Sequence, residues 1–280
     1  MAVTLLLFSI DINVINAISL VFILLFGVPH GALDHKIYFS TSSNKGKAKF
    51  FILYTGLIVA YLVWWFFEPI SAFVFFLLLS AFHFGQEFLE EHQVQNSLPL
   101  NLIWGFLIII APLLYNYEEV TPYLEALTKL SLPSLDSRLL IWIPVSNVLL
   151  ALCSLFYLQA KERIVQAKVI EVLVFVALML LLHTQLYFVT AFTLYFLFFH
   201  SMNAFAHQFQ WLKKQDSSYT MKRFVIDLAG FSVIAIIGIV GLLFFIDPTD
   251  TVTVTSYFFV LVSVITLPHA VIFDYFYGHK

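Results

Sequence analysis

Long apolar stretches follow one another along the chain and are separated by short polar segments. A helix of about 20 apolar residues spans the hydrocarbon core of a bilayer, so each stretch predicts one transmembrane helix. The weakest division lies at His183, Thr184 and Gln185, where two spans meet with almost no loop and one long bent helix is the alternative. The expected spans, nine in all, lie near residues 12–33, 48–67, 70–90, 98–117, 138–159, 166–183, 185–208, 224–246 and 254–277.

The composition agrees with a membrane protein. Of 280 residues 61% are apolar and only 11% are charged. This composition is too apolar for a water-soluble domain of this length. We therefore expect one all-α, polytopic membrane domain over residues 1–280. The small net charge of −3 gives no basic face for nucleic acid. Cys153 has no cysteine partner, and residues 1–10 lack the basic segment and cleavage site of a signal peptide.

The basic residues predict how the helices are oriented. Cytoplasmic loops of membrane proteins are enriched in Lys and Arg. If nine helices alternate in direction, only Lys129 and Arg138 lie on the other side from the remaining lysines and arginines. The N-terminus is therefore expected outside and the C-terminus in the cytoplasm. The residues on the expected cytoplasmic side are Lys36, Lys45, Lys47, Lys49, Lys161, Arg163, Lys168, Lys213, Lys214, Lys222, Arg223 and Lys280.

Five histidines share one expected depth in the membrane. They lie in the inner halves of the first, third, seventh and ninth spans, which all run from outside to inside. Each alone could simply hydrogen-bond a neighbouring helix. Together they predict a metal site, because imidazole is the commonest metal ligand and unpaired polar rings are costly in an apolar medium. The five candidate ligands are His30, His83, His200, His207 and His269.

The other four histidines have simpler interpretations. His35 lies five residues after His30, about 140° round a helix, so an unbroken helix cannot turn both toward one ion. We assign His35 to the membrane interface. His92, His183 and His279 are expected to be structural or solvated.

Polar neighbours of the candidate ligands strengthen the metal-site prediction. Carboxylate and amide side chains lie one helical turn after three of the histidines, on the same helix face. Such groups accept the free imidazole N–H and orient the ring. Proline precedes His30 and His269 directly, and Pro29 and Pro268 can each bend a membrane helix at a cavity. The candidates for orienting groups are Asp34, Gln86, Glu87 and Asn203.

Four motifs carry a family resemblance. PHGALDH, AFHFGQE, FFHSMNAFAHQ and TLPHAVIFDY, in that order, resemble the Brp/Blh family of bacterial membrane β-carotene 15,15′-dioxygenases. The resemblance implies an inner-membrane enzyme that uses non-haem Fe(2+) to add O2 across the central double bond of β-carotene. It also implies that His30, His83 and His200 are the catalytic iron ligands. The product is two retinal molecules, which gives a possible functional link to a microbial rhodopsin.

One position departs from the family pattern. The family usually has a second histidine four residues after the one in its HS motif, where this chain has Ala204. His207 is two turns from His200 at nearly the same angle and could substitute if the helix bends. His269 is the alternative fourth ligand, and the sequence leaves the choice open.

A carotenoid substrate would enter the protein from the lipid bilayer, and aromatic side chains near the histidines would line its path. The candidate substrate-lining residues are Trp64, Trp65, Phe82, Phe84, Phe198 and Phe199.

Three other functions are possible for a histidine-rich membrane protein. A di-iron desaturase or hydroxylase needs HxxxH and HxxHH clusters, which are absent. A haem carrier would place histidines near both membrane surfaces. A metal transporter would need acidic residues in the outer halves of the spans.

Overall fold

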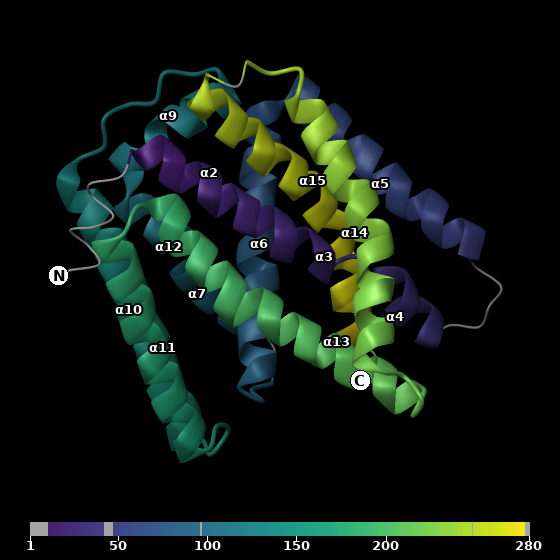
Figure 1. Ribbon diagram of the computed structural model, residues 1–280. Helices are drawn as coiled ribbons and strands as arrows, with labels where there is room; N and C mark the ends of the chain where they lie inside the picture. The colour runs from purple at the N-terminus through teal and green to yellow at the C-terminus, as the bar shows by residue number, and fades with distance from the viewer. Residues whose placement is uncertain (1–10, 42–46, 96, 248, 278–280) are drawn as a thin grey trace. The chain divides into compact units, whose positions relative to one another are not determined.

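The computed structural model describes residues 11–41, 47–95, 97–247 and 249–277 (Figure 1), and these residues form helices and turns with no strand. This confirms the all-α prediction. The side chains of His30, Ser40, Thr41 and residues 273–277 are outside the description. Lys45, His279, Lys280 and the first ten residues also lie outside the described residues.

The helix bounds match most of the expected spans. Among the described residues eight helices are long and apolar enough to cross a membrane, and Ile12–Gly27 is a shorter apolar helix. The chain is therefore a multi-pass helical membrane protein. Helix α11 ends at Gln185 and α12 begins at Phe188, so the sixth and seventh spans are separate helices. The elements are α2 (Ile12–Phe22), η1 (Ile23–Gly27), α3 (Val28–His30), α4 (Asp34–Thr41), α5 (Lys47–Phe67), α6 (Pro69–Glu91), α7 (Leu98–Gly105), η3 (Phe106–Ile110), α8 (Ala111–Tyr115), α9 (Tyr117–Thr128), α10 (Ser137–Ala160), α11 (Gln166–Gln185), α12 (Phe188–Tyr195), η4 (Phe196–Ser201), α13 (Met202–Gln215), α14 (Met221–Leu243) and α15 (Thr251–Tyr277).

Two segments differ from the sequence prediction. The first span does not run unbroken to residue 33, because α3 ends at His30 and α4 begins at Asp34. Pro29 lies in the first turn of α3 and has no backbone N–H to donate, and a turn follows it. The longest expected loop contains the short helix α9, which carries acidic residues in its first turn and is capped at its C-terminal end by Lys129, whose φ is 57°.

Contacts between Cα atoms divide the chain into two compact units. Unit 1 contains Phe73–Phe192, and unit 2 joins Ala2–Ala72 to Thr193–Lys280. The expected single membrane domain stays a prediction.

In unit 1 two helices cross with their backbones in contact. A Cβ atom added to Gly85 of α6 would lie 1.8 Å from the carbonyl oxygen of Asn101, and one added to Gly105 would lie 1.6 Å from that of Ala81. Neither position has room for a side chain. These glycines let α6 and α7 approach closely, as small residues do at helix contacts in membranes. They thereby fix the part of α6 that carries His83.

In unit 2 helix α15 packs against α2, α4, α5 and α14, and η1 packs against η4. At one end Thr251 donates a hydrogen bond of 2.7 Å to Asn13, which joins the first turns of α15 and α2. Toward the other end Lys36 forms an ion pair with Asp227 of α14. Helices α2 and α15 therefore begin at the same end of unit 2, as the alternating nine-helix arrangement predicts.

Candidate metal centre

His269 and Asp34 form a buried hydrogen-bonded pair in unit 2. Nδ1 of His269 lies 2.8 and 3.0 Å from the two carboxylate oxygens of Asp34. The residues are only 5% and 3% exposed. Since a carboxylate accepts, Nδ1 carries the proton and the ring's lone pair is on Nε2. This is the tautomer and the orientation that a metal-binding histidine needs.

The backbone around this pair explains how it forms. A Cβ atom on Gly31 would lie 3.4 Å from Nδ1 of His269, so the ring lies closely against the turn that separates α3 from α4. That turn places Asp34 at the start of α4 beside α15. The sequence argument paired Asp34 with His30 on one unbroken helix. The break after His30 instead gives Asp34 a partner on a distant segment.

Tyr54 of α5 completes the pair on its other side. Its hydroxyl donates a hydrogen bond of 3.0 Å to Oδ2 of Asp34. The carboxylate thus accepts one hydrogen bond from α15 and another from α5, and these bonds compensate for burying its charge. Tyr54 was not among the residues predicted from the sequence. Thr55 and Tyr61 carry hydroxyl groups in the same span, so nothing in the sequence distinguishes Tyr54.

The segments that carry His30 and His200 also meet in unit 2. A Cβ atom on Gly27 of η1 would lie 2.5 Å from the Phe196 ring of η4, so these two π-helical segments are in close contact. His200 is 2% exposed, and its ring stacks on that of Phe196 with centroids 4.9 Å apart. π-Helical turns are frequent at functional sites. His30 ends α3, three residues after η1, and its side chain is outside the description.

In unit 1 the candidate ligand His83 has a carboxylate beside it. His83 is 2% exposed, and one of its ring nitrogens and a carboxylate oxygen of Glu87 lie within 4.8 Å of each other. Both residues are on α6, one turn apart, as the sequence predicted. Gln86 is also buried, and the Phe84 ring contacts that of His83 edge to face at 5.7 Å.

The two residues proposed as the fourth ligand have different surroundings. His269 is buried and hydrogen-bonded to Asp34, whereas His207 is exposed on α13. Asn203, expected to orient a ligand, donates its amide N–H to the carbonyl of Phe199 at 3.0 Å. The described contacts therefore favour His269.

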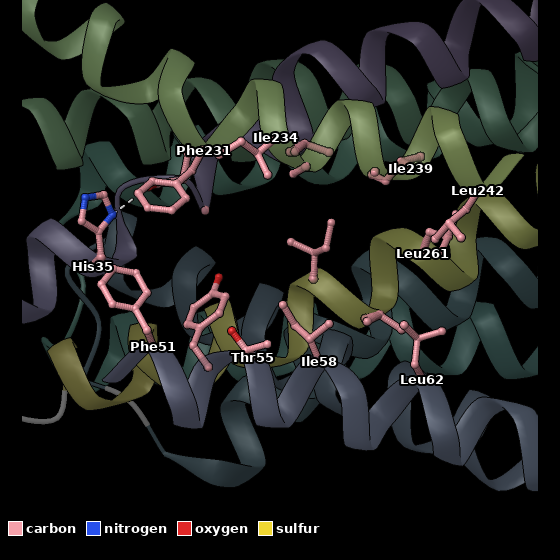
Figure 2. A pocket seen from close by; sticks show the side chains of 18 of the residues that line it. His35, Phe51, Thr55, Ile58, Leu62, Phe231, Ile234, Ile239, Leu242 and Leu261 are labelled. Atoms are coloured by element: carbon pink, nitrogen blue, oxygen red, sulfur yellow. Dashed lines mark hydrogen bonds between the residues drawn. The ribbon is translucent and has the colours of Figure 1, made fainter. Parts of the chain in front are cut away.

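Unit 2 contains an elongated apolar cavity of about 380 Å³ between α5, α14 and α15 (Figure 2). Its lining on α5 runs from Phe50 to Leu62, or roughly 18 Å at 1.5 Å per residue. His35 and Phe51 lie in its wall at one end, and Leu242 and Leu261 lie at the other. The cavity could not be predicted from the sequence, because most of its lining residues are ordinary apolar residues of membrane helices.

The aromatic residues expected to line a substrate path lie elsewhere, and none of them is in the wall of this cavity. The indole N–H groups of Trp64 and Trp65 donate to Ser71 and Ser263 at 2.8 and 3.0 Å. Phe84 is buried against His83. Half-buried Phe82 and Phe199 and exposed Phe198 complete the set.

The remaining described histidines have local partners or burial. His35 is half-buried, its Nδ1 donates to the Ala32 carbonyl at 3.1 Å, and burial lowers its pKa. His92 donates to the Phe88 carbonyl at 2.8 Å, and burial lowers its pKa also. His183 is buried near the end of α11. The local bonds of His35 and His92 are those of structural histidines.

Comparison with known proteins identifies the family. A sequence model described as β-carotene 15,15′-dioxygenase matches residues 21–277. A curated protein named β-carotene 15,15′-dioxygenase, from the uncultured marine bacterium 66A03, is 26% identical over 265 residues, which cover 92% of this chain and 93% of the relative. No solved structure matches the chain. The match covers all five candidate metal-binding histidines, and the chain therefore belongs to the β-carotene 15,15′-dioxygenase family of carotenoid-cleaving dioxygenases.

Proposed function

We propose that this protein is an iron(II)-dependent enzyme that cleaves the central 15,15′ double bond of β-carotene with O2 and releases two retinal molecules. The family match over residues 21–277 carries the proposal. The buried His269–Asp34 pair supports the metal, because it has the chemistry of an oriented imidazole ligand. Each retinal receives one oxygen atom, so both atoms of O2 are accounted for.

We assign the iron ligands to His30, His83, His200 and His269. His30, His83 and His200 are assigned from their shared depth in the spans and from the family resemblance. His269 takes the fourth position in preference to His207 because it is buried and its Nδ1 is held by Asp34. Neutral imidazole ligands suit ferrous iron, and four of them would leave coordination positions on the ion open for O2.

The residues of the chain would bind and orient the reactants. Iron, when bound, supplies the ability to activate O2. Asp34 holds the His269 ring in one tautomer, and Tyr54 holds Asp34. Glu87 follows His83 by one turn of α6, with a carboxylate oxygen within 4.8 Å of a ring nitrogen, and we assign it the role of orienting that ring when iron is bound. The apolar helices around these groups exclude water, which protects a ferrous site from unwanted proton and oxidation chemistry.

The location follows from the same proposal. β-Carotene partitions into lipid, so we place the enzyme in the lipid bilayer of a bacterial inner membrane, with its C-terminus in the cytoplasm. The substrate reaches the protein from the hydrocarbon layer. Retinal released there would be available to a microbial rhodopsin, which is the proposed functional partner.

Expression in bacterial cells that accumulate β-carotene tests the function. The proposal predicts loss of orange colour and the appearance of retinal, measured by chromatography of the cell extract. His83→Ala should leave β-carotene intact although the protein is still present in the membrane fraction. Retinal formation at the normal rate by His83→Ala would overturn the ligand assignment, and no retinal from the unchanged protein would overturn the function.

A further inference from the structure

We propose that the apolar cavity of unit 2 binds one ring-bearing end of the carotenoid substrate and that Gly238 determines how long an end it accepts. The inference rests on the proposed function and adds the place where the substrate is held. The cavity is built from α5, α14 and α15 together with the turn around Gly31.

The shape and lining of the cavity suit a stiff apolar rod. Its walls run along one face of α5 and one face of α14, and its volume of about 380 Å³ is within the range of about 300–1,000 Å³ typical of ligand pockets. Thr55 lies in the middle of the α5 wall. A polyene has no hydrogen-bonding groups to satisfy, so the apolar side chains of α5 and α14 in this wall would bind it through apolar contact.

The polar side chains of the cavity wall are those of His35, Tyr54 and Thr55, and Tyr54 connects the wall to the proposed reaction centre. Tyr54 lines the cavity, and its hydroxyl binds Asp34, which holds His269. Gly31 lines the cavity as well and lies against the His269 ring. A substrate end seated in the cavity would therefore extend toward His269, which is what cleavage at a central bond requires.

The cavity is also accessible from the side, where lipid would lie. The lining residues Phe231, Ile234 and Leu242 of α14 are 42%, 67% and 51% exposed. A carotenoid dissolved in the bilayer could enter here without crossing water. A lipid acyl chain could enter in the same way. A cavity that serves only to hold lipid, however, does not need a tyrosine that connects its wall to a histidine–carboxylate pair.

Glycines on α14 provide a matched test. Gly238 lines the cavity, and an added Cβ atom would meet nothing within 4 Å. Gly241, on the same helix, has the same open surroundings but is not in the cavity wall. Gly238→Phe therefore fills the cavity, and Gly241→Phe adds the same bulk outside it. Thr55→Phe and Gly56→Phe form a second pair on α5, because Thr55 lines the cavity and Gly56 does not.

The measurements are kcat/KM for β-carotene in detergent, iron per chain, and β-carotene retained by chelator-treated protein. Gly238→Phe should lower both kcat/KM and pigment retention at least about tenfold with unchanged iron, whereas Gly241→Phe should stay within about twofold. With an apocarotenal substrate that is shortened at one end, the Gly238→Phe deficit should be smaller, because the short end fits the remaining space.

Several outcomes would overturn the inference. If the unchanged protein forms retinal and Gly238→Phe matches Gly241→Phe, the cavity does not hold the substrate. If Gly238→Phe does not fold, the Thr55→Phe and Gly56→Phe pair decides in the same way. If the unchanged protein forms no retinal but retains β-carotene in a Gly238-dependent manner, the proposed function fails while the binding site stands.

Discussion

Asp34 shows at the scale of single residues why a partner is harder to predict than a ligand. Histidines at one membrane depth could be recognised from the sequence, since buried polar groups are costly unless they bind something. The partner of Asp34 could not be recognised. It depends on the turn after His30, which brings Asp34 to His269, 235 positions away along the chain. The role of Tyr54 could not be recognised either, because it exists only after α4, α5 and α15 pack together.

Asp34→Asn tests the orienting role of the carboxylate. The amide oxygen of asparagine carries no full negative charge, so it would hold the Nδ1–H of His269 less strongly than the carboxylate does. Iron affinity should therefore fall about 10- to 100-fold. The measurement is iron per chain after dialysis against graded chelator. Asp227→Asn is the control, because Asp227 pairs with Lys36 and Tyr219. Equal iron retention in the two variants would contradict the role of Asp34.

The choice of the fourth ligand is tested by a second pair of variants. His269→Ala should lose iron and β-carotene cleavage, because it removes a buried, oriented imidazole. His207→Ala should keep most of both, because His207 is exposed on α13. Elemental analysis and retinal chromatography measure the two effects. Loss of iron in His207→Ala alone would reverse the assignment.

At the scale of helices, hydropathy predicted the spans well and their interruptions poorly. The long helices α5, α6, α10, α11 and α14 begin and end within a few residues of the expected bounds, because about 20 apolar residues and polar ends suffice to define them. The π-helical segments η1 and η4 and the helix α9 were not predicted. Their formation depends on packing contacts, such as that of Gly27 with Phe196, which no single segment encodes.

The crossing of α6 and α7 predicts a sharp effect of one methyl group. Gly105→Ala would place Cβ against the backbone of Ala81, so the helices must separate. We expect a loss of about 1–3 kcal/mol and a lower melting temperature in detergent, measured by fluorescence-detected size exclusion after heating. Gly56→Ala is the control, since nothing lies within 4 Å of its added Cβ. Equal melting temperatures for the two variants would show that α6 and α7 do not cross as described.

At the scale of the whole molecule, the charge pattern predicts sidedness. The contacts of Asn13 with Thr251 and of Lys36 with Asp227 agree with the expected alternating directions of the helices of unit 2. Tags placed in the loops after α4, α10 and α13 should be cytoplasmic. Tags in the loops after α9 and α14 should be external. Protease protection in spheroplasts and in inverted vesicles gives the answer. An external loop after α13 would overturn the nine-helix topology.

The most direct test of the central claim is retinal formation by the purified protein before and after removal of iron. Chelator treatment under anaerobic conditions should abolish the conversion of β-carotene to retinal, and Fe(2+) should restore it when O2 is admitted, whereas Zn(2+) should not. Chromatography should find two retinal molecules for each β-carotene consumed. Full activity in protein shown to be free of iron, or a product cleaved away from the central bond, would contradict the account.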